Sequence, residues 1–287
     1  MKIGYNQANG KNCSTLETDL ALCERVGFDY IEIRLDMLHS YLKNHSMASL
    51  CDFFAASRIK PHALNAIYCY DSLFLRQDQA QSDFMEEFEF ASQAAAQMGA
   101  MYIIVVPPIN LDRVTPYAGS RSEIQDRCVA IMSRLGEVAS EYGVKLCFEL
   151  VGASCCSVRS ISCAKDIVEA VDRENVGYVF DTYNIFLGDR QEQYSRMTEV
   201  EPSKIFAVHI NDCDDIPVTE MGQDKRCFCG HGVLDLAGYL RALKKTGYDG
   251  MVSIETFRPG YWEKTPQWIV ENAYSTTLRV LRENNCL

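Results

Sequence analysis

One local pattern repeats along the chain: an amphipathic run, then a glycine, then a short run rich in β-branched and aromatic residues. It appears as ALCERVGFDYIEIR, AAAQMGAMYIIVVP, EVASEYGVKLCFEL and RALKKTGYDGMVSIET. The glycines, at positions 27, 99, 143 and 247, suit the left-handed residue that ends many helices. The pattern therefore predicts helices that alternate with strands, which is typical of βα units around a parallel sheet.

Two motifs of capping-box form indicate where helices begin. They are Ser14-x-x-Glu17 and Ser120-x-x-Glu123. Eight candidate strands lie between the helical segments, near residues 2–7, 29–34, 61–67, 102–107, 145–150, 176–181, 205–211 and 251–257. Eight such units in 287 residues predict a (β/α)8 TIM barrel, with residues 1–287 forming a single domain. The alternative is an open doubly wound sheet, but no glycine-rich nucleotide loop follows the first strand.

The charge balance argues against a nucleic acid or an anionic membrane as partner. The chain has 28 Lys and Arg against 39 Asp and Glu, a formal charge of -11, and no basic run. No window approaches the roughly 20 apolar residues of a membrane span, and the first residues do not resemble a signal peptide. We therefore expect a cytoplasmic protein that acts on a small molecule.

Thirteen cysteines are scattered along the chain. Their odd number and lack of a regular spacing indicate reduced thiols rather than a disulfide framework. Cys155-Cys156 and Cys227-x-Cys229 form two clusters, and His231 follows the second. Because the spacing is not that of a zinc knuckle, we interpret both clusters as loop thiols.

Four late strands each end in a side chain that could bind a metal. Glu149 lies in LCFEL, Asp181 in GYVFD, His209 in FAVHI and Glu255 in VSIET. A carboxylate inside an apolar strand is costly unless it is paired or bound to a cation. In a barrel, the carboxyl ends of the strands form the active-site face, so the four side chains are expected to meet there.

Strand alternation supports this interpretation. The residues two positions earlier share the face of each polar end and are small or modest: Cys147, Val179, Ala207 and Ser253. The intervening residues are larger and apolar: Phe148, Phe180, Val208 and Ile254. We therefore expect the polar ends to point into the barrel mouth while the bulky face meets the helices.

Two Glu, one Asp and one His predict a site for one divalent ion, which could be Mn, Zn, Mg or Co. The alternative is that each polar strand end is solvated at the rim or satisfied by a neighbouring residue. A divalent ion can polarise a ketone and acidify the adjacent C–H, and a carboxylate can then remove that proton. Glu149 and Glu255 lie on strands 5 and 8, so they could flank a polyol or sugar substrate and exchange its protons.

Other polar residues near strand ends and loops are weaker candidates for substrate contacts. They are Glu32, Arg34, His62, Asn65, Arg226 and Arg258. Tyr261 and Trp262 could form a wall beside a sugar-like ring.

Several stretches together resemble a known family. They are IKPHALNA, NVGYVFDTYN, HINDCDDIP, GVLDL and VSIETFRP. The chain resembles the sugar isomerase/epimerase superfamily of xylose-isomerase-like barrels, and within it the inosose isomerases (2-keto-myo-inositol isomerases) of inositol catabolism. The resemblance covers nearly the whole chain. It implies Glu149, Asp181, His209 and Glu255 as ligands of one divalent ion, with Glu149 and Glu255 as the catalytic pair that isomerises a cyclic polyol ketone.

Two departures from the family pattern fall on expected substrate contacts. Asn184 stands where the family often has histidine after the sixth strand, and His231 stands in a Gly-His-Gly loop that usually carries Glu or Gln. A ketose 3-epimerase is the alternative within the superfamily. A more remote alternative is an abasic-site endonuclease, an enzyme class that has a His-rich three-metal site. Another is a barrel that binds sugar without catalysis. The chain has only five histidines.

Overall fold

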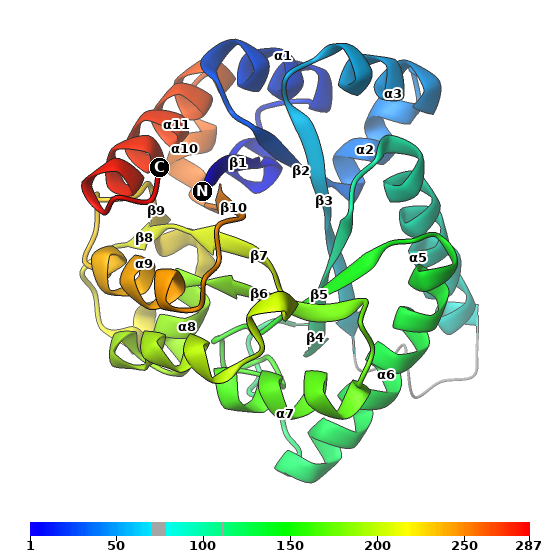
Figure 1. The fold of residues 1–287 in the computed structure, drawn as a ribbon, viewed down its shortest axis with the longest axis vertical. Helices are drawn as coiled ribbons and strands as arrows, with labels where there is room; N and C mark the ends of the chain where they lie inside the picture. The colour runs from blue at the N-terminus through cyan, green and yellow to red at the C-terminus, as the bar shows by residue number, and fades with distance from the viewer. Residues whose placement is uncertain (71–78, 111) are drawn as a thin grey trace.

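The computed structural model describes residues 1–70, 79–110 and 112–287. Eight parallel strands close into a barrel in the order β1-β10-β7-β6-β5-β4-β3-β2 (Figure 1). The barrel strands are β1 (Lys2–Asn6), β2 (Tyr30–Arg34), β3 (Lys60–Tyr70), β4 (Tyr102–Ile109), β5 (Lys145–Glu149), β6 (Val176–Asp181), β7 (Ile205–Ile210) and β10 (Met251–Ile254). The predicted TIM barrel is confirmed, and the open doubly wound sheet is excluded because β1 pairs with β10.

Helices surround the barrel (Figure 1). They are α1 (Leu16–Val26), α2 (Leu35–Leu42), α3 (Met47–Ala56), α5 (Gln79–Met98), α6 (Arg121–Glu141), α7 (Ile161–Val171), α8 (Thr182–Gly188), α9 (Leu236–Lys245), α10 (Pro259–Trp262) and α11 (Pro266–Glu283). Short 3-10 helices lie at residues Gln7–Gly10, Gln191–Glu199, Pro202–Lys204, Val218–Glu220 and Gln223–Lys225. Within the described residues, no helix has the length and apolar character needed to cross a membrane.

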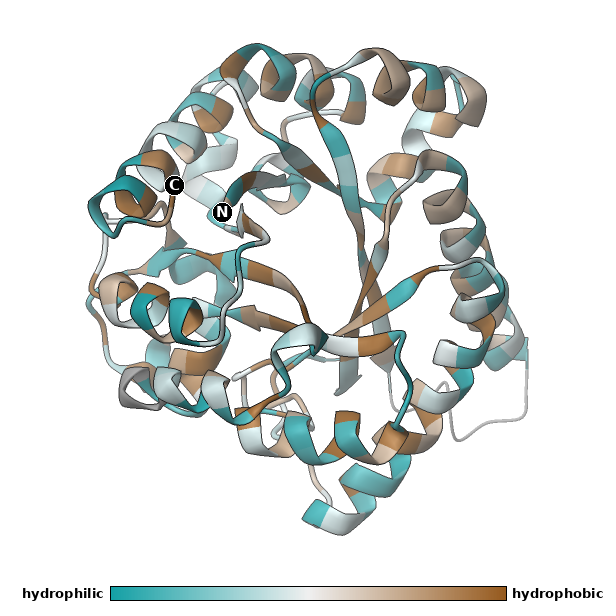
Figure 2. Ribbon diagram, in the orientation of Figure 1, coloured by the Kyte–Doolittle hydropathy of each residue, from teal (hydrophilic) through white to brown (hydrophobic). Residues whose placement is uncertain are grey.

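Apolar side chains form separate layers inside and outside the barrel wall. The outer core lies between strands and helices and includes Phe148, Phe180, Val208 and Ile254. An inner cluster fills the barrel itself and consists of Ala63, Ile104, Cys147, Val179, Phe206 and Ala207. Figure 2 shows brown, apolar segments along the strands and mixed teal and brown segments along the surrounding helices. The predicted alternation of faces is thus correct.

The helix termini follow the predicted signals with one exception. Ser120 and Glu123 form a reciprocal capping box at the start of α6. Glycines 27, 99, 143 and 247 all have positive φ, as expected for residues that end helices. At α1, however, the N-cap is Thr15 and not Ser14. The Ser14 hydroxyl instead donates a 2.6 Å hydrogen bond to the buried carboxylate of Asp19.

Two features at the carboxyl end of the barrel had no counterpart in the sequence analysis. Strands β8 (Asp212–Cys213) and β9 (Arg226–Cys227) pair antiparallel in a small separate sheet. This pairing brings Arg226, at the end of a long loop, back towards the barrel mouth. Asp212 accepts hydrogen bonds from the backbone N–H groups of Gly230, Gly232 and Leu234, which fixes the following turn.

Candidate metal centre

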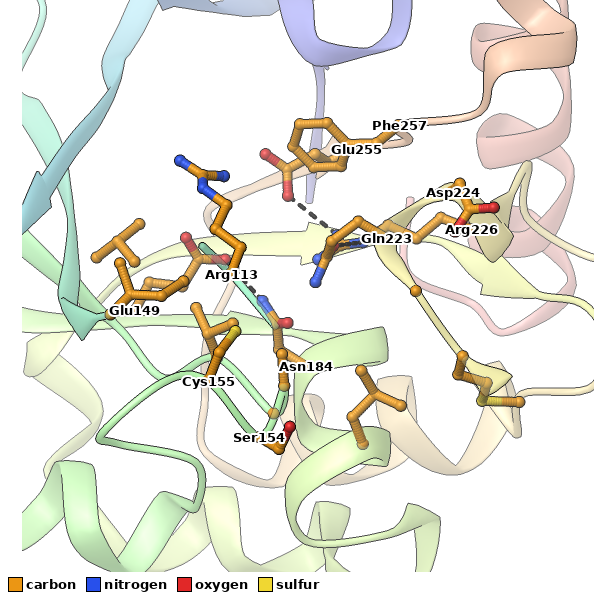
Figure 3. Close-up of a pocket in the computed structure, with 18 of the residues that line it drawn as sticks. Arg113, Glu149, Ser154, Cys155, Asn184, Gln223, Asp224, Arg226, Glu255 and Phe257 are labelled. Atoms are coloured by element: carbon orange, nitrogen blue, oxygen red, sulfur yellow. Dashed lines mark hydrogen bonds and ion pairs between the residues drawn. The ribbon is translucent and has the colours of Figure 1, made fainter. Parts of the chain in front are cut away.

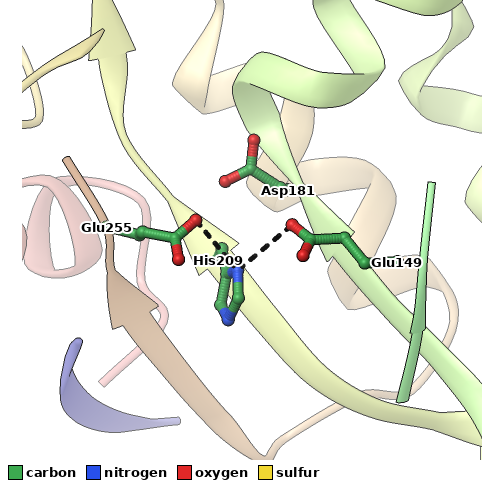
Figure 4. A group of neighbouring side chains, drawn as sticks. All are labelled: Glu149, Asp181, His209 and Glu255. Carbon is green, nitrogen blue, oxygen red and sulfur yellow. Dashed lines mark ion pairs between the residues drawn. The ribbon is translucent and has the colours of Figure 1, made fainter. Parts of the chain in front are cut away.

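The four polar strand ends meet in space. Glu149 ends β5, Asp181 ends β6, His209 lies one residue before the end of β7, and Glu255 directly follows β10. One ligand atom from each lies within 4.8 Å of every other, and all four residues are buried (Figure 4). Strands β6 and β7 are parallel neighbours, and their register places Asp181 beside His209. Strand geometry alone therefore assembles a group that can hold a metal ion.

The two ring nitrogens of His209 have different partners. Nε2 lies 2.9 Å from Oε2 of the fully buried Glu32. Nδ1 makes no hydrogen bond to the described part of the chain, and lies 3.4 Å from Glu255 and 3.6 Å from Glu149. With a proton on Nε2 held by Glu32, a neutral imidazole turns its Nδ1 lone pair towards carboxylate oxygens.

These separations suit a cation between the ligands. Two donors each about 2.1 Å from a tetrahedrally coordinated zinc ion lie about 3.4 Å apart. The Nδ1 distances of 3.4 and 3.6 Å to Glu255 and Glu149 are close to that value. Three carboxylates and one imidazole also form a donor set that suits a divalent ion. The residues present therefore fit the predicted metal.

Amide and guanidinium groups hold the carboxylates in position. Asn6, at the end of β1, donates to both Glu32 and Glu255 at 2.8 Å. Asn65 donates to the same Oε1 of Glu255 at 3.1 Å, and Arg226 donates to Oε2 at 3.0 Å. Both oxygens of Glu255 are thus occupied by donors.

Asp181 also has donors on both oxygens, since the backbone N–H of Asn184 donates to its Oδ1 at 2.7 Å, whereas Glu149 has fewer donors. Arg226 and Asn211 donate to Oδ2 of Asp181 at 2.8 and 2.7 Å. Asn184 donates to Oε1 of Glu149 at 3.0 Å. No hydrogen bond reaches Oε2 of Glu149 from the described residues, and this oxygen is the carboxylate position best able to accept a substrate proton.

The charges in this cluster shift its pKa values in opposite directions. Burial raises the pKa of Glu149 to about 7, with His209 opposing and Glu255 adding to the rise. Burial acts the same way on Glu255, but His209 and Arg226 outweigh it and lower its pKa to about 2. Burial would lower the pKa of His209, yet Glu32 and Glu255 raise it well above its ordinary value. The carboxylates therefore favour a positive charge at their centre.

A cavity of about 1060 Å³ opens above this cluster (Figure 3). Six of the predicted site residues line it: Arg34, Asn65, Glu149, Asn184, Arg226 and Glu255. Asp181 and His209 are fully buried beneath them. Trp262 also lines the cavity, whereas Tyr261 stacks on Phe228 instead.

Four other predicted substrate contacts lie outside the residues that line this cavity. Glu32 is behind His209. His62 lies nearer the start of β3 and lines a different cavity of about 820 Å³, beside Tyr102. Arg258 pairs with Asp214 at 3.0 Å. His231 is exposed.

Sequence reasoning missed several residues at this site. Asn6 ends the first strand, so the rule that identified the four ligands could have found it. Lys11, Tyr68, Arg113 and Phe257 also line the cavity. Lys11 and Arg113 lie in loops that follow β1 and β4, which is the usual place for binding residues in this fold.

Comparison with known proteins identifies the family. A family model described as the xylose isomerase-like TIM barrel matches residues 20–283. The chain belongs to the xylose isomerase-like TIM barrel family. An inosose isomerase of Halalkalibacterium halodurans is 35% identical over 285 residues, covering 99% of this chain and 98% of the relative. A ketose 3-epimerase of Arthrobacter globiformis is 26% identical over 129 residues, covering 45% of this chain and 40% of that enzyme.

A solved member of similar fold carries a metal. The structure described as IOLI protein with a binding zinc atom is 34% identical, has a TM-score of 0.90 and covers 99% of both chains. In the xylose isomerase-like barrel described here, Glu149, Asp181, His209 and Glu255 form a buried group competent to bind such an ion. The prediction of a metal-binding barrel is therefore confirmed.

Proposed function

We propose that this chain is an inosose isomerase that uses one divalent ion held by Glu149, Asp181, His209 and Glu255. Full-length similarity to an inosose isomerase carries the proposal. The buried ligand group beneath a cavity of about 1060 Å³ supports it, because the cavity could admit a polyol ketone above the ion. Zinc and manganese are the candidate ions. We retain the predictions of a cytoplasmic location and of a single domain over residues 1–287.

The reaction needs a proton to move between adjacent carbons of the substrate. A bound divalent ion would polarise the ketone and acidify the neighbouring C–H. Glu149 is the better initial base, because one of its oxygens accepts no hydrogen bond from the described residues while both oxygens of Glu255 are occupied. As Glu149 takes the proton, the C–H electrons form a C=C bond and the carbonyl π electrons move to the ketone oxygen, which gives an enediolate.

The second half of the reaction returns a proton to the former carbonyl carbon. The former hydroxyl carbon becomes the new ketone as its O–H proton passes to the oxygen on the former carbonyl carbon, so no external oxidant or reductant is needed. Arg226 donates to both Asp181 and Glu255, and it would help to hold the substrate oxygens from the loop side. Glu255 also lines the cavity, with a ligand oxygen within 4.8 Å of that of Glu149, and is the candidate for returning the proton.

Isotope exchange tests this function. Metal-loaded enzyme with 2-keto-myo-inositol in deuterated water should introduce deuterium next to the ketone while a positional isomer accumulates. Glu149→Gln should lose most of this exchange at equal metal occupancy, since an amide cannot accept the proton. Labelling of a ketohexose at carbon 3 without inosose turnover would replace this function with 3-epimerisation. Absence of labelling in both substrates would contradict enolisation.

A further inference from the structure

The cavity mouth has a charge opposite to that of the molecule. The whole chain has a formal charge of -11. Six cationic side chains nevertheless line the cavity, namely Lys11, Arg34, Arg113, Arg159, Arg190 and Arg226, against the three acidic ones Glu149, Asp224 and Glu255. Two of these acids belong to the metal centre. A neutral polyol does not require such an excess of positive charge.

Most of these cations already have partners. Arg226 bonds to Asp181 and Glu255, and Arg34 makes two hydrogen bonds to Asp36 at 2.9 and 2.8 Å. The side chains of Arg159 and Arg190 donate to backbone carbonyls. These four of the six cationic side chains therefore each have hydrogen-bond partners within the protein.

Lys11 and Arg113 differ from the others. Neither has a carboxylate partner within the ranges that the structure describes, and both contact aromatic rings. Lys11 Nζ lies 4.9 Å from the ring centroid of Trp262. Arg113 lies 4.6 Å from the Tyr68 ring centroid and donates to the Tyr70 hydroxyl at 2.6 Å. Aromatic faces orient a cation without neutralising it.

The two unneutralised cations and Arg34 act on one another. Burial lowers the pKa of Lys11, and the charges of Arg34 and Arg113 lower it further, while Asp36 opposes them. Tyr68 also lines the cavity; burial, Glu255 and Glu149 raise its pKa, while Arg113 and Arg34 lower it. In Figure 3 the Arg113 side chain extends into the cavity near Glu149. Like charges held together in a partly buried site are costly unless an anion joins them.

We propose that Lys11 and Arg113, beside the Arg34–Asp36 pair, form an anion subsite that binds a carboxylate or phosphate group on the substrate. The substrate class is then a cyclic polyol ketone with an anionic substituent, whose ketone faces Glu149 and whose anion faces the subsite. Arg113 offers several donors in one plane, which suits the oxygens of either group. The proposal rests on the proposed function, since it refines the substrate of the same cavity.

Kinetics with matched substrates tests the substrate class. We expect kcat/KM for a phosphorylated or carboxylated inosose to exceed that for neutral 2-keto-myo-inositol by at least about tenfold at low salt. Arg113→Gln and Lys11→Met should each reduce this preference by about tenfold or more, because a charge-assisted hydrogen bond is lost. Comparison of the phosphorylated and carboxylated substrates identifies which anion the subsite prefers.

Lys145→Met is the matched control. Lys145 Nζ also lies over an aromatic ring, 5.0 Å from the Phe206 centroid, but Phe206 lines the other cavity and Lys145 does not line this one. Its removal changes the net charge equally and should leave the substrate preference intact. Equal kcat/KM for neutral and anionic inososes, or an equal loss of preference in Lys145→Met, would overturn the subsite.

A binding measurement separates this proposal from the proposed function. Titration calorimetry with inorganic phosphate should give binding to the metal-loaded enzyme that weakens about tenfold in Arg113→Gln and not in Lys145→Met. Phosphate can also bind the ion, so the comparison between variants decides the result. If no ketone is turned over but this difference persists, the isomerase function fails and the anion subsite stands. Unchanged phosphate affinity in Arg113→Gln contradicts the subsite whatever the activity.

Discussion

His209 presents its two ring nitrogens to two different environments. Nε2 contacts Glu32, which is itself held by Asn6 on β1, and Nδ1 faces the carboxylates of Glu149 and Glu255. This arrangement fixes the tautomer in which Nδ1 can donate an electron pair. Glu32 therefore suits a positioning role, whereas the sequence had suggested a substrate contact.

Glu32→Gln should weaken metal binding about 10- to 100-fold without unfolding the barrel, since the amide keeps the shape of the side chain but not its charge. Competition with a chromophoric chelator measures the affinity. Glu137→Gln, an exposed change on α6, is the control. An affinity for Glu32→Gln equal to that of the control would argue against this role of Glu32.

Asn184 is expected to influence which ketone the enzyme prefers. Its Nδ2 donates to Glu149, while its Oδ1 is buried beside the cavity without a hydrogen bond from the described residues. Asn184→His would replace this acceptor with a larger ring, so relative kcat/KM values for inosose and ketohexoses should change severalfold. An unchanged ratio across that panel would mean that Asn184 does not contact the substrate.

At the scale of elements, the helix termini and strand faces follow from short-range chemistry. Ser120 accepts from the N–H of Glu123, whose side chain accepts from the Ser120 N–H in return. Loss of the hydroxyl removes the acceptor for one otherwise unpaired N–H group at the start of α6.

Ser120→Ala should destabilise the protein by about 1 kcal/mol, or lower its melting temperature by roughly 2 °C. Thermal unfolding followed by circular dichroism measures the shift. Ser122→Ala, two residues later in the same helix, should cost clearly less, because Ser122 does not cap the helix. Equal shifts in the two variants would count against the capping box.

The barrel and the four candidate ligands were predictable because they depend on period and strand position. Alternation along β5 to β7 puts Cys147, Val179 and Ala207 on the inner face, two residues before the ligands. The supporting contacts were not predictable in the same way. Arg226 reaches Asp181 only because β9 pairs with β8, and two-residue strands leave no periodic signal.

At the scale of the whole molecule, the barrel has a second polar group below the metal centre. His62 is buried, and its Nδ1 lies 3.8 Å from Oε1 of Glu32 without a hydrogen bond from the described chain. Burial lowers the pKa of His62 to about 4, and Glu32 only partly opposes this. The folded state therefore favours neutral His62, whereas the unfolded chain binds a proton near its ordinary pKa of 6.5.

Stability should consequently fall as the pH decreases from about 6.5 to 4, because the unfolded state binds the proton first. The loss from this group is roughly 2 to 3 kcal/mol between neutral pH and the lower end of that window. His62→Phe should remove this loss of stability at acid pH. Unfolding measured at several pH values, with a chelator present throughout, tests this. His45→Phe, at the surface, should retain the acid loss. Identical pH dependence in His62→Phe and the unmodified chain would contradict a buried neutral His62.

The inner cluster is apolar and includes Cys147, Val179 and Ala207, each two residues before a ligand on the same strand. A region of that kind has a low dielectric constant, while the cavity above the ligands opens to solvent. Low-dielectric walls concentrate field lines in the more polarisable space beside them. The inner cluster is thus a low-dielectric layer below the ligands. The electric field of a bound divalent ion would therefore be directed outward, into the cavity where a ketone would be polarised.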